Sequence, residues 1–295
     1  MVRPVVPEAE REIGVKHPVL GHGYIVLVDY MGNDAAIVQA ARVSYGKGTK
    51  AVRDDRGLIR YLMRHRHTTP FEMVEFKFLV RLPIFVARQW IRHRMASVNE
   101  YSARYSVVPD EYEVPAAEEV RHQSTRNRQG RGDPLPGAVV EQFRADLERV
   151  SKDAYTSYSR ALEAGVARET ARLLLPVAYY TQWYWKSDLW NLFHFLSLRL
   201  DPHAQEEIRL YAAEMAKITR LVAPAAYEAF EDFSLESLSL SRAERVAVRA
   251  LLDGKTPEAA CTVAGLPLMR DDGKPMTSGE GVEFLEKLAR IRTPG

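Results

Sequence analysis

Residues 72–93 limit the possible folds most, because they predict a strand followed at once by a helix. Apolar and polar side chains alternate from Glu72 to Leu82, which is the period of a strand with one buried face. Pro83 suits the first turn of a helix, where the N–H that proline lacks would have no partner. We expect that helix to run from Ile84 to about His93. The inward strand residues are Val74, Phe76, Phe78, Val80 and Leu82.

The other patterns predict an α/β (α+β) fold with a mixed sheet flanked by long helices. Strands are expected at residues 24–30 and within 173–185; helices are expected through residues 37–41 and at about 54–66, 137–164, 188–199 and 201–222. Residues 1–20 read as an irregular arm and residues 115–137 as a long basic loop. We expect one domain over residues 1–234 and a helical extension over 235–295 that packs on it.

Composition excludes several classes of protein. Of 295 residues, 46% are hydrophobic and 27% charged, as in a soluble globular protein. The net charge of +2 is too small to bind polyanions by bulk charge, so a nucleotide site must be a local cluster. The single cysteine, Cys261, allows no internal disulfide and favours a cytoplasmic location. We also expect no signal peptide, and no membrane span, which takes about 20 apolar residues.

Residues 92–105 are poor material for a core, because almost every side chain there needs a polar partner. Together with Arg88 they bring four arginines against one glutamate, and these like charges repel unless an anion lies among them. Guanidinium groups match phosphate oxygens, whereas a solvated basic face is the usual explanation of a charge run. The interleaved Ser97, Asn99, Ser102 and Tyr105 add hydrogen-bonding groups and favour a nucleotide site.

Two further polar clusters leave alternatives open. Residues 65–72 contain two histidines, but their spacing matches no known metal motif, and Thr68 or Thr69 could simply cap a helix. The second cluster comprises His194, Arg199, Asp201 and His203. Asp201 and Pro202 suit the start of a helix, which would place His203 at a helix N-terminus and favour its neutral form. Arg199 forms either a salt bridge with Asp201 or part of a site.

Several nucleotide and hydrolase motifs are missing. The chain has no Gly-x-Gly-x-x-Gly after a strand, no phosphate-binding Walker loop and no Gly-x-Ser-x-Gly elbow. Cys261 lies among apolar residues, so we expect a small buried side chain rather than a nucleophile.

The segment from Arg92 to Tyr105 resembles the signature of the flavin-dependent thymidylate synthase family, Arg-His-Arg-x-x-Ser-x-Asn-Glu-x-Ser-x-Arg-Tyr, at every fixed position. The resemblance continues through residues 40–44, 67–72, 85–90, 171–176 and 198–205, and so spans about residues 23 to 230. It implies formation of dTMP from dUMP, with methylenetetrahydrofolate as carbon donor, FAD as redox relay and NADPH as reductant. It also implies a homotetramer with active sites where subunits meet.

The resemblance assigns residues to two ligands and implies no metal. Arg199 is implied as the catalytic residue at the uracil ring. The implied FAD-binding residues are Ser44, His67, Thr69, Glu72, Arg92, His93, Arg94, Glu100, His194 and His203. The implied dUMP-binding residues are Gln89, Arg92, Glu100, Ser102, Ala103, Arg104, Arg172 and Arg199.

Other interpretations remain. A basic surface with Trp90, Tyr101 and Tyr105 would also suit a module that binds single-stranded nucleic acid, although the resemblance implies no nucleic-acid partner. A flavoprotein without synthase activity is a third possibility. No base for Ser102 is evident nearby, so we expect it to bind dUMP rather than attack it. Arg66 stands where the family often has a small residue, and the roles of residues 121–136 and of the tail stay open.

Overall fold

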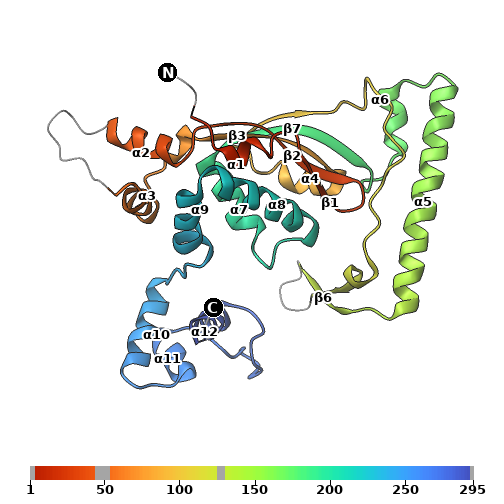
Figure 1. Ribbon diagram of the computed structural model, residues 1–295. Coiled ribbons are helices and arrows are strands. Elements are labelled where there is room, and N and C mark those ends of the chain that lie inside the picture. The colour runs from red at the N-terminus through yellow and green to blue at the C-terminus, as the bar shows by residue number, and fades with distance from the viewer. Residues whose placement is uncertain (1–3, 44–53, 125–129, 293–295) are drawn as a thin grey trace. The chain divides into compact units, whose positions relative to one another are not determined.

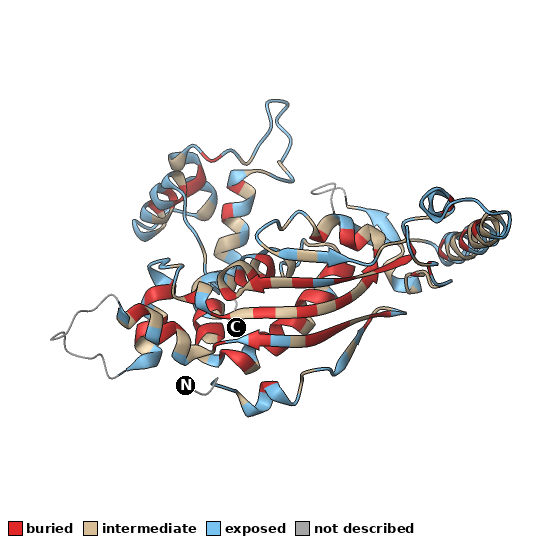
Figure 2. Cartoon of the chain, turned by 90° about the horizontal axis from the view of Figure 1, so that it is seen from above, coloured by how far each residue is buried: buried red, intermediate tan, exposed pale blue. Residues whose placement is uncertain are grey.

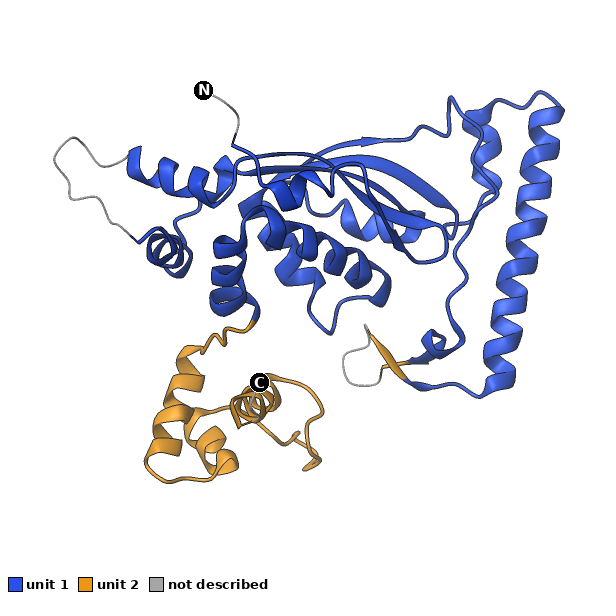
Figure 3. Ribbon diagram, viewed as in Figure 1, with its two compact units in different colours: residues 1–122, 133–235 blue, residues 123–132, 236–295 orange. Residues whose placement is uncertain are grey.

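The computed structural model describes residues 4–43, 54–124 and 130–292. The chain divides into two compact units, which Figure 3 shows in different colours. Unit 1 comprises residues 1–122 and 133–235, and unit 2 comprises residues 123–132 and 236–295.

A five-stranded sheet forms the centre of unit 1 (Figure 1). Its order is β1 (Lys16–Val19), β2 (Gly23–Met31), β3 (Glu75–Pro83), β7 (Tyr180–Asp188) and β4 (Ser97–Glu100). Every pair of neighbouring strands described in this sheet is antiparallel. The predicted mixed sheet is therefore wrong: the connection from β3 through α4 to β4 passes over the position that β7 fills, and β7 then pairs antiparallel with both strands.

The alternating strand is the middle strand of the sheet. The five predicted inward residues, Val74 just before β3 and four within it, are fully buried, which confirms the alternation. Figure 2 shows the buried positions repeating along the strands. Residues Glu75 to Pro83 pair with Asp188 to Tyr180 of β7. Helices α4 (Ile84–Trp90), α7 (Leu189–Arg199) and α8 (Glu206–Val222) meet β7 at Trp90, whose ring contacts Trp183, Trp185, Phe195 and Tyr211.

A group of short helices packs at one end of the sheet. It contains α2 (Asp34–Val43), α3 (Asp55–Arg64), the 3-10 helix η1 (Phe71–Met73), α9 (Pro224–Phe230) and the π-helix η4 (Glu231–Leu235). Asp34, at the start of α2, accepts hydrogen bonds from Ala225 N at 2.8 Å and Ala226 N at 2.9 Å. These contacts cap α9 from a helix far away in the sequence.

The segment that follows the sheet's β4 strand leads to the longest helix, α5 (Gly137–Glu163), as predicted. After it come α6 (Arg168–Ala171) and the 3-10 helix η3 (Arg172–Leu174). Tyr158 and Tyr179 pack with Ala171 and Val108 in a small buried cluster that joins these elements.

Three segments differ from the prediction. In the predicted irregular arm over residues 1–20, the described residues 4–20 contain α1 (Pro7–Glu10) and β1. Proline is tolerated on an edge strand, and Pro18 lies in β1, which pairs only with β2. The predicted loop over residues 115–137 contains η2 (Ala117–Glu119) and a two-stranded sheet of β5 (Arg121–Gln123) and β6 (Arg131–Pro134). Within residues 92–105, β4 pairs with β7 although its side chains are mostly polar.

Unit 2 has its own core. Its helices are α10 (Arg242–Leu252), α11 (Pro257–Ala264) and α12 (Glu280–Arg292). Their buried residues include Ala247, Ala260, Cys261 and Phe284. Cys261 is buried among apolar side chains, which confirms the expectation of a small buried side chain at this position. Among the helices that the structure describes, none is long and apolar enough to cross a membrane.

Candidate active site

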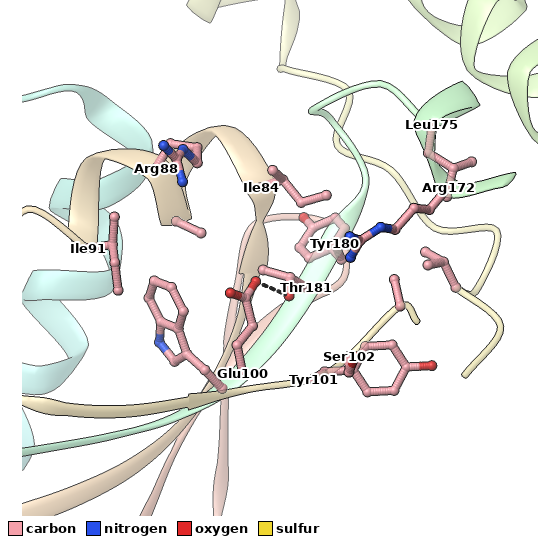
Figure 4. Close-up of a pocket in the computed structure, with 14 residues that line it drawn as sticks. Ile84, Arg88, Ile91, Glu100, Tyr101, Ser102, Arg172, Leu175, Tyr180 and Thr181 are labelled. Atoms are coloured by element: carbon pink, nitrogen blue, oxygen red, sulfur yellow. Dashed lines mark hydrogen bonds between the residues drawn. The ribbon is translucent and has the colours of Figure 1, made fainter. Parts of the chain in front are cut away.

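A cavity of about 460 Å³ opens in unit 1 between α4, the end of β4, η3 and β7 (Figure 4). Its charged and polar lining comes from residues distant in the sequence: Arg88, Glu100, Ser102, Arg172, Tyr180 and Thr181. Apolar side chains such as Ile84, Ile91, Leu175 and Trp183 complete the wall. The cavity is therefore mostly apolar with a few convergent polar groups, as small-molecule sites are.

The Glu100 carboxylate is fixed at the cavity wall. Its Oε1 accepts a hydrogen bond from Thr181 Oγ1 at 2.7 Å, drawn as a dashed line in Figure 4. Thr181 lies on β7 and is 8% exposed, so the donor is held by the sheet. Glu100 pairs with Trp183 at the end of β4, which brings the polar segment 92–105 against the cavity.

Helix α4 supplies the opposite wall and is anchored at both ends. At its start, Ile84 N donates to Tyr179 O at 2.9 Å and Phe85 N donates to Val177 O at 3.0 Å. At its end, Trp90 is fully buried. Arg88 thereby reaches the cavity, although the site residues expected from the sequence did not include it. The signal was available, because Arg88 and Arg92 are one helical turn apart.

A cluster of His93, His194 and Arg199 joins the turn after α4 to α7. Arg199 Nε donates to His93 Nε2 at 2.9 Å, and the His93 ring lies 6.0 Å from the ring of His194. Burial, together with the charges of Arg199 and His194, lowers the pKa of His93 to about 4. The imidazole is therefore neutral at physiological pH and accepts the hydrogen bond. Burial also lowers the pKa of Arg199.

The predicted helix start at Asp201 is wrong. Helix α8 begins at Glu206 after the cap residue Gln205, so Asp201 and His203 lie in the turn before it. Asp201 Oδ1 accepts from His203 N at 2.7 Å and lies 2.9 Å from His203 Nδ1. The Asp201 carboxylate therefore stabilises a local turn with the N–H of His203, two residues later, and does not cap α8.

Comparison with known proteins identifies the family. The family model described as "Thymidylate synthase complementing protein" matches residues 26–225. A relative named "Flavin-dependent thymidylate synthase" from Gluconobacter oxydans is 54% identical over 257 residues, which cover 86% of this chain and 85% of the relative. The chain belongs to the flavin-dependent thymidylate synthase family. It is therefore an enzyme, and the family expected from residues 92–105 is confirmed.

Other family relatives extend the comparison. The flavin-dependent thymidylate synthase of Dictyostelium discoideum is 52% identical over 263 residues, covering 84% of this chain and 86% of the relative. A solved structure of a UMP/dUMP methylase, PolB from Streptomyces cacaoi bound with 5-Br dUMP, matches with a TM-score of 0.66 and 37% identity. It covers 74% of this chain and 99% of that chain.

The structure gathers only part of the site expected from the family resemblance. Glu100, Ser102, Ala103 and Arg172 line the cavity. Arg104 is next in the chain, and its guanidinium group pairs with Glu169. His93, His194 and Arg199 lie together in the cluster described above, outside the cavity lining. The remaining expected residues do not line the cavity: His67, Thr69, Glu72, Gln89, Arg92, Arg94 and His203. Ser44 lies outside the described residues.

Three further observations concern this site. Gln89 Oε1 is buried and has no hydrogen-bond partner among the described residues. No three histidine, cysteine or acidic side chains of the described residues gather into a possible metal site. Trp90 is fully buried, which rules out the stacking role that a nucleic-acid module would require of it.

Proposed function

We propose that this enzyme converts dUMP to dTMP by reductive methylation, with methylenetetrahydrofolate as carbon donor and NADPH as reductant. The observation that carries the proposal is the cavity in which Glu100, Ser102 and Arg172 converge beside Arg104. The related methylase from Streptomyces cacaoi was solved with 5-Br dUMP, a nucleotide of the same class.

The nucleotide phosphate is assigned to Arg104, Arg172 and Ser102. Two guanidinium groups and a hydroxyl supply charge-assisted hydrogen bonds, which are stronger than neutral ones. Figure 4 shows Arg172 and Arg88 on different sides of the cavity, with Glu100 and Thr181 between them. A ligand with an anionic end and a polar ring fits such a distribution of charge.

Arg199 is assigned to the uracil ring. Methylation at C5 requires electron density to build up on the ring, and an arginine at a ring carbonyl stabilises this charge. Its partner His93 is neutral, so the positive charge of Arg199 is not cancelled by that contact. Nε is engaged by His93, which leaves the terminal nitrogens to donate to the substrate.

The residues that the resemblance assigns to FAD, called here the flavin-side residues, suit this cofactor chemically. When bound, FAD would pass electrons from NADPH to the substrate. Arg92 and Arg94 are exposed cations that suit a pyrophosphate, and His67 and Thr69 are exposed hydrogen-bonding groups. Because Nε2 accepts from Arg199, the neutral His93 carries its proton on Nδ1 and can donate from there without adding charge. Ser44, Glu72, Glu100, His194 and His203 complete the proposed set.

Neighbouring subunits are proposed to complete the site in a homotetramer. Large apolar side chains stand exposed in and beside the segments that line the cavity: Tyr105 at 71%, Leu173 at 79% and Val177 at 59%. Such exposed patches mark interfaces. Most flavin-side residues do not line the cavity within one chain, so a second copy is needed to bring them to the nucleotide.

The decisive experiment measures tritium release from 5-labelled dUMP by the flavin-loaded protein with NADPH and methylenetetrahydrofolate. Release together with dTMP formation is expected, and its absence in a yellow, folded protein would refute the proposal. A Cys261→Ala variant should keep full activity, because the thiol is fully buried and burial raises its pKa. Loss of dTMP synthesis in that variant, if still folded and flavin-loaded, would contradict a mechanism without a cysteine nucleophile.

A further inference from the structure

We infer that Glu169 is a positioning residue for nucleotide binding, acting through the arginines assigned to the phosphate. This inference rests on the proposed function. Arg104 follows β4, whereas Arg172 begins η3, so the two guanidinium groups come from separate segments. Glu169, on α6, contacts both of them.

The carboxylate of Glu169 orients Arg104. Glu169 Oε2 accepts a hydrogen bond from Arg104 Nε at 3.1 Å and lies 3.1 Å from one of the terminal nitrogens. The backbone carbonyl of Glu169 accepts from Arg172 Nε at 3.2 Å. Glu169 thus contacts the Nε of both arginines, with its side chain for Arg104 and its backbone carbonyl for Arg172.

Donors remain for a ligand in this arrangement. Arginine carries five N–H groups in a planar fork. Glu169 engages the Nε side of Arg104, which leaves the other terminal nitrogen for a phosphate oxygen. For Arg172 the carbonyl contact uses only Nε, so both terminal nitrogens remain. Glu169 therefore fixes the two side chains without using up their capacity to bind an anion.

Helix α6, which carries Glu169, is held in place by packing and by a hydrogen bond to a neighbouring loop. Ala171, in the same helix, is 2% exposed and packs with Tyr158 and Tyr179. Arg168 donates from a terminal nitrogen to Tyr105 O at 2.7 Å, which ties α6 to the loop that carries Arg104. Glu169 is also the only acid in α6, whose neighbours Arg168 and Arg172 are both cations. Its charge reduces the repulsion among the three arginines.

A plain surface ion pair is the competing explanation. The side chains of Arg104 and Glu169 are 53% and 55% exposed, and exposed pairs contribute little to stability. Ordering a long side chain before the ligand arrives lowers the entropy lost on binding. The effect of Glu169 should therefore appear in affinity for dUMP rather than in the melting temperature.

The test compares E169Q with the wild type, both as flavin-loaded holoenzyme. We expect the Kd for dUMP, measured by calorimetry, to rise about tenfold, which is about 1.4 kcal/mol. The KM for dUMP should rise with it, while kcat at saturating dUMP changes less than twofold. Inhibition by deoxyuridine, which has no phosphate, should be unaffected. The control E163Q removes a carboxylate from the exposed end of α5 and should leave all four quantities unchanged.

A double-mutant cycle separates positioning from other roles. If Glu169 acts through Arg104, E169Q should weaken dUMP binding far less in an R104A background than in the wild type. Unchanged or tighter dUMP binding by E169Q would overturn the inference, as would an equal loss of deoxyuridine affinity. A wild-type holoenzyme that binds no dUMP would refute the proposed function instead.

Discussion

At the scale of single residues, Arg66 adopts a backbone conformation just after the end of α3 that is unfavourable for a residue with a Cβ. Arg66 has φ 56°, in the left-handed region. Its N–H donates to Met63 O at 3.1 Å, and His67 N donates to Leu62 O at 2.9 Å. This pair of bonds is the Schellman motif, in which the left-handed residue is usually glycine. Glycine would adopt this conformation without strain.

We expect Arg66→Gly to raise the free energy of unfolding by about 1 kcal/mol, because the left-handed conformation strains a residue that has a Cβ. Urea or thermal unfolding would measure the change. Arg64→Gly is the matched control: Arg64 ends α3 in a helical conformation, so glycine there should lower stability. A lower stability of the Arg66→Gly variant would contradict the assignment of strain.

The neutral state of His93 predicts a dependence of stability on pH. Its pKa in the folded chain is about 4, below the value near 6.5 of an unperturbed histidine. Between these values the unfolded state binds more protons, so this residue's contribution is fully present above pH 6.5 and is lost as pH falls toward 4. His93→Gln should therefore flatten the fall of the melting temperature over this range. Equal slopes for both proteins would show that His93 is not held neutral.

At the scale of elements, the cap on α9 is supplied by another helix. Pro224 opens α9 and has no N–H, so Ala225 and Ala226 carry its first free donors. Both bind the Asp34 carboxylate at the start of α2. Burial nevertheless raises the pKa of Asp34, since it outweighs the two hydrogen bonds.

Asp34→Ala should lower the free energy of unfolding by about 1–2 kcal/mol, since it leaves two helix N–H groups without their acceptor. Denaturant titration would measure the loss. Asp153→Ala, which removes an exposed carboxylate from α5, should change stability by less than about 0.5 kcal/mol. Equal effects of the two substitutions would show that Asp34 does not cap α9.

Strongly patterned elements could be predicted from the sequence, and weakly patterned ones could not. The alternation in β3 follows from which side chains are buried. The helical spacing of apolar residues predicts α5 as well, although the residues that α5 buries are only Val140, Ser151 and Tyr158. Strand β4 has no such pattern, because three of its four side chains are polar, and its pairing depends on β7. The contacts of Arg199 with His93 and of Arg104 with Glu169 are tertiary, so the sequence could suggest the residues for the site but not their partners.

At the scale of the whole molecule, the two units have separate cores. The family model matches residues 26–225, which include residues 123–132 of unit 2 but none of residues 236–295. Six buried residues form the core of unit 2, which makes a segment of this size only marginally stable. We propose that residues 236–295 form a helical extension whose folding is not required for the cavity.

Phe284→Ala should test this separation. Phe284 is fully buried in unit 2, and such substitutions cost about 3–5 kcal/mol, enough to unfold a small core. Limited proteolysis should then cut residues 236–295 while flavin absorbance and dUMP affinity stay unchanged. Phe195→Ala, in the core of unit 1, should instead abolish both. Loss of flavin binding in the Phe284→Ala variant would show that the units depend on each other.

The backbone hydrogen bonds at the start of α4 have a consequence for which parts of the cavity substitutions can change. They join the helix that carries Arg88 directly to the carbonyls of Val177 and Tyr179, on the same stretch of chain as Arg172. Among substitutions, only a proline in place of Ile84 or Phe85 would remove one of these N–H groups. These bonds set the spacing between α4 and the segment before β7 through the backbone, whereas the side chains that line the cavity can be exchanged without breaking them.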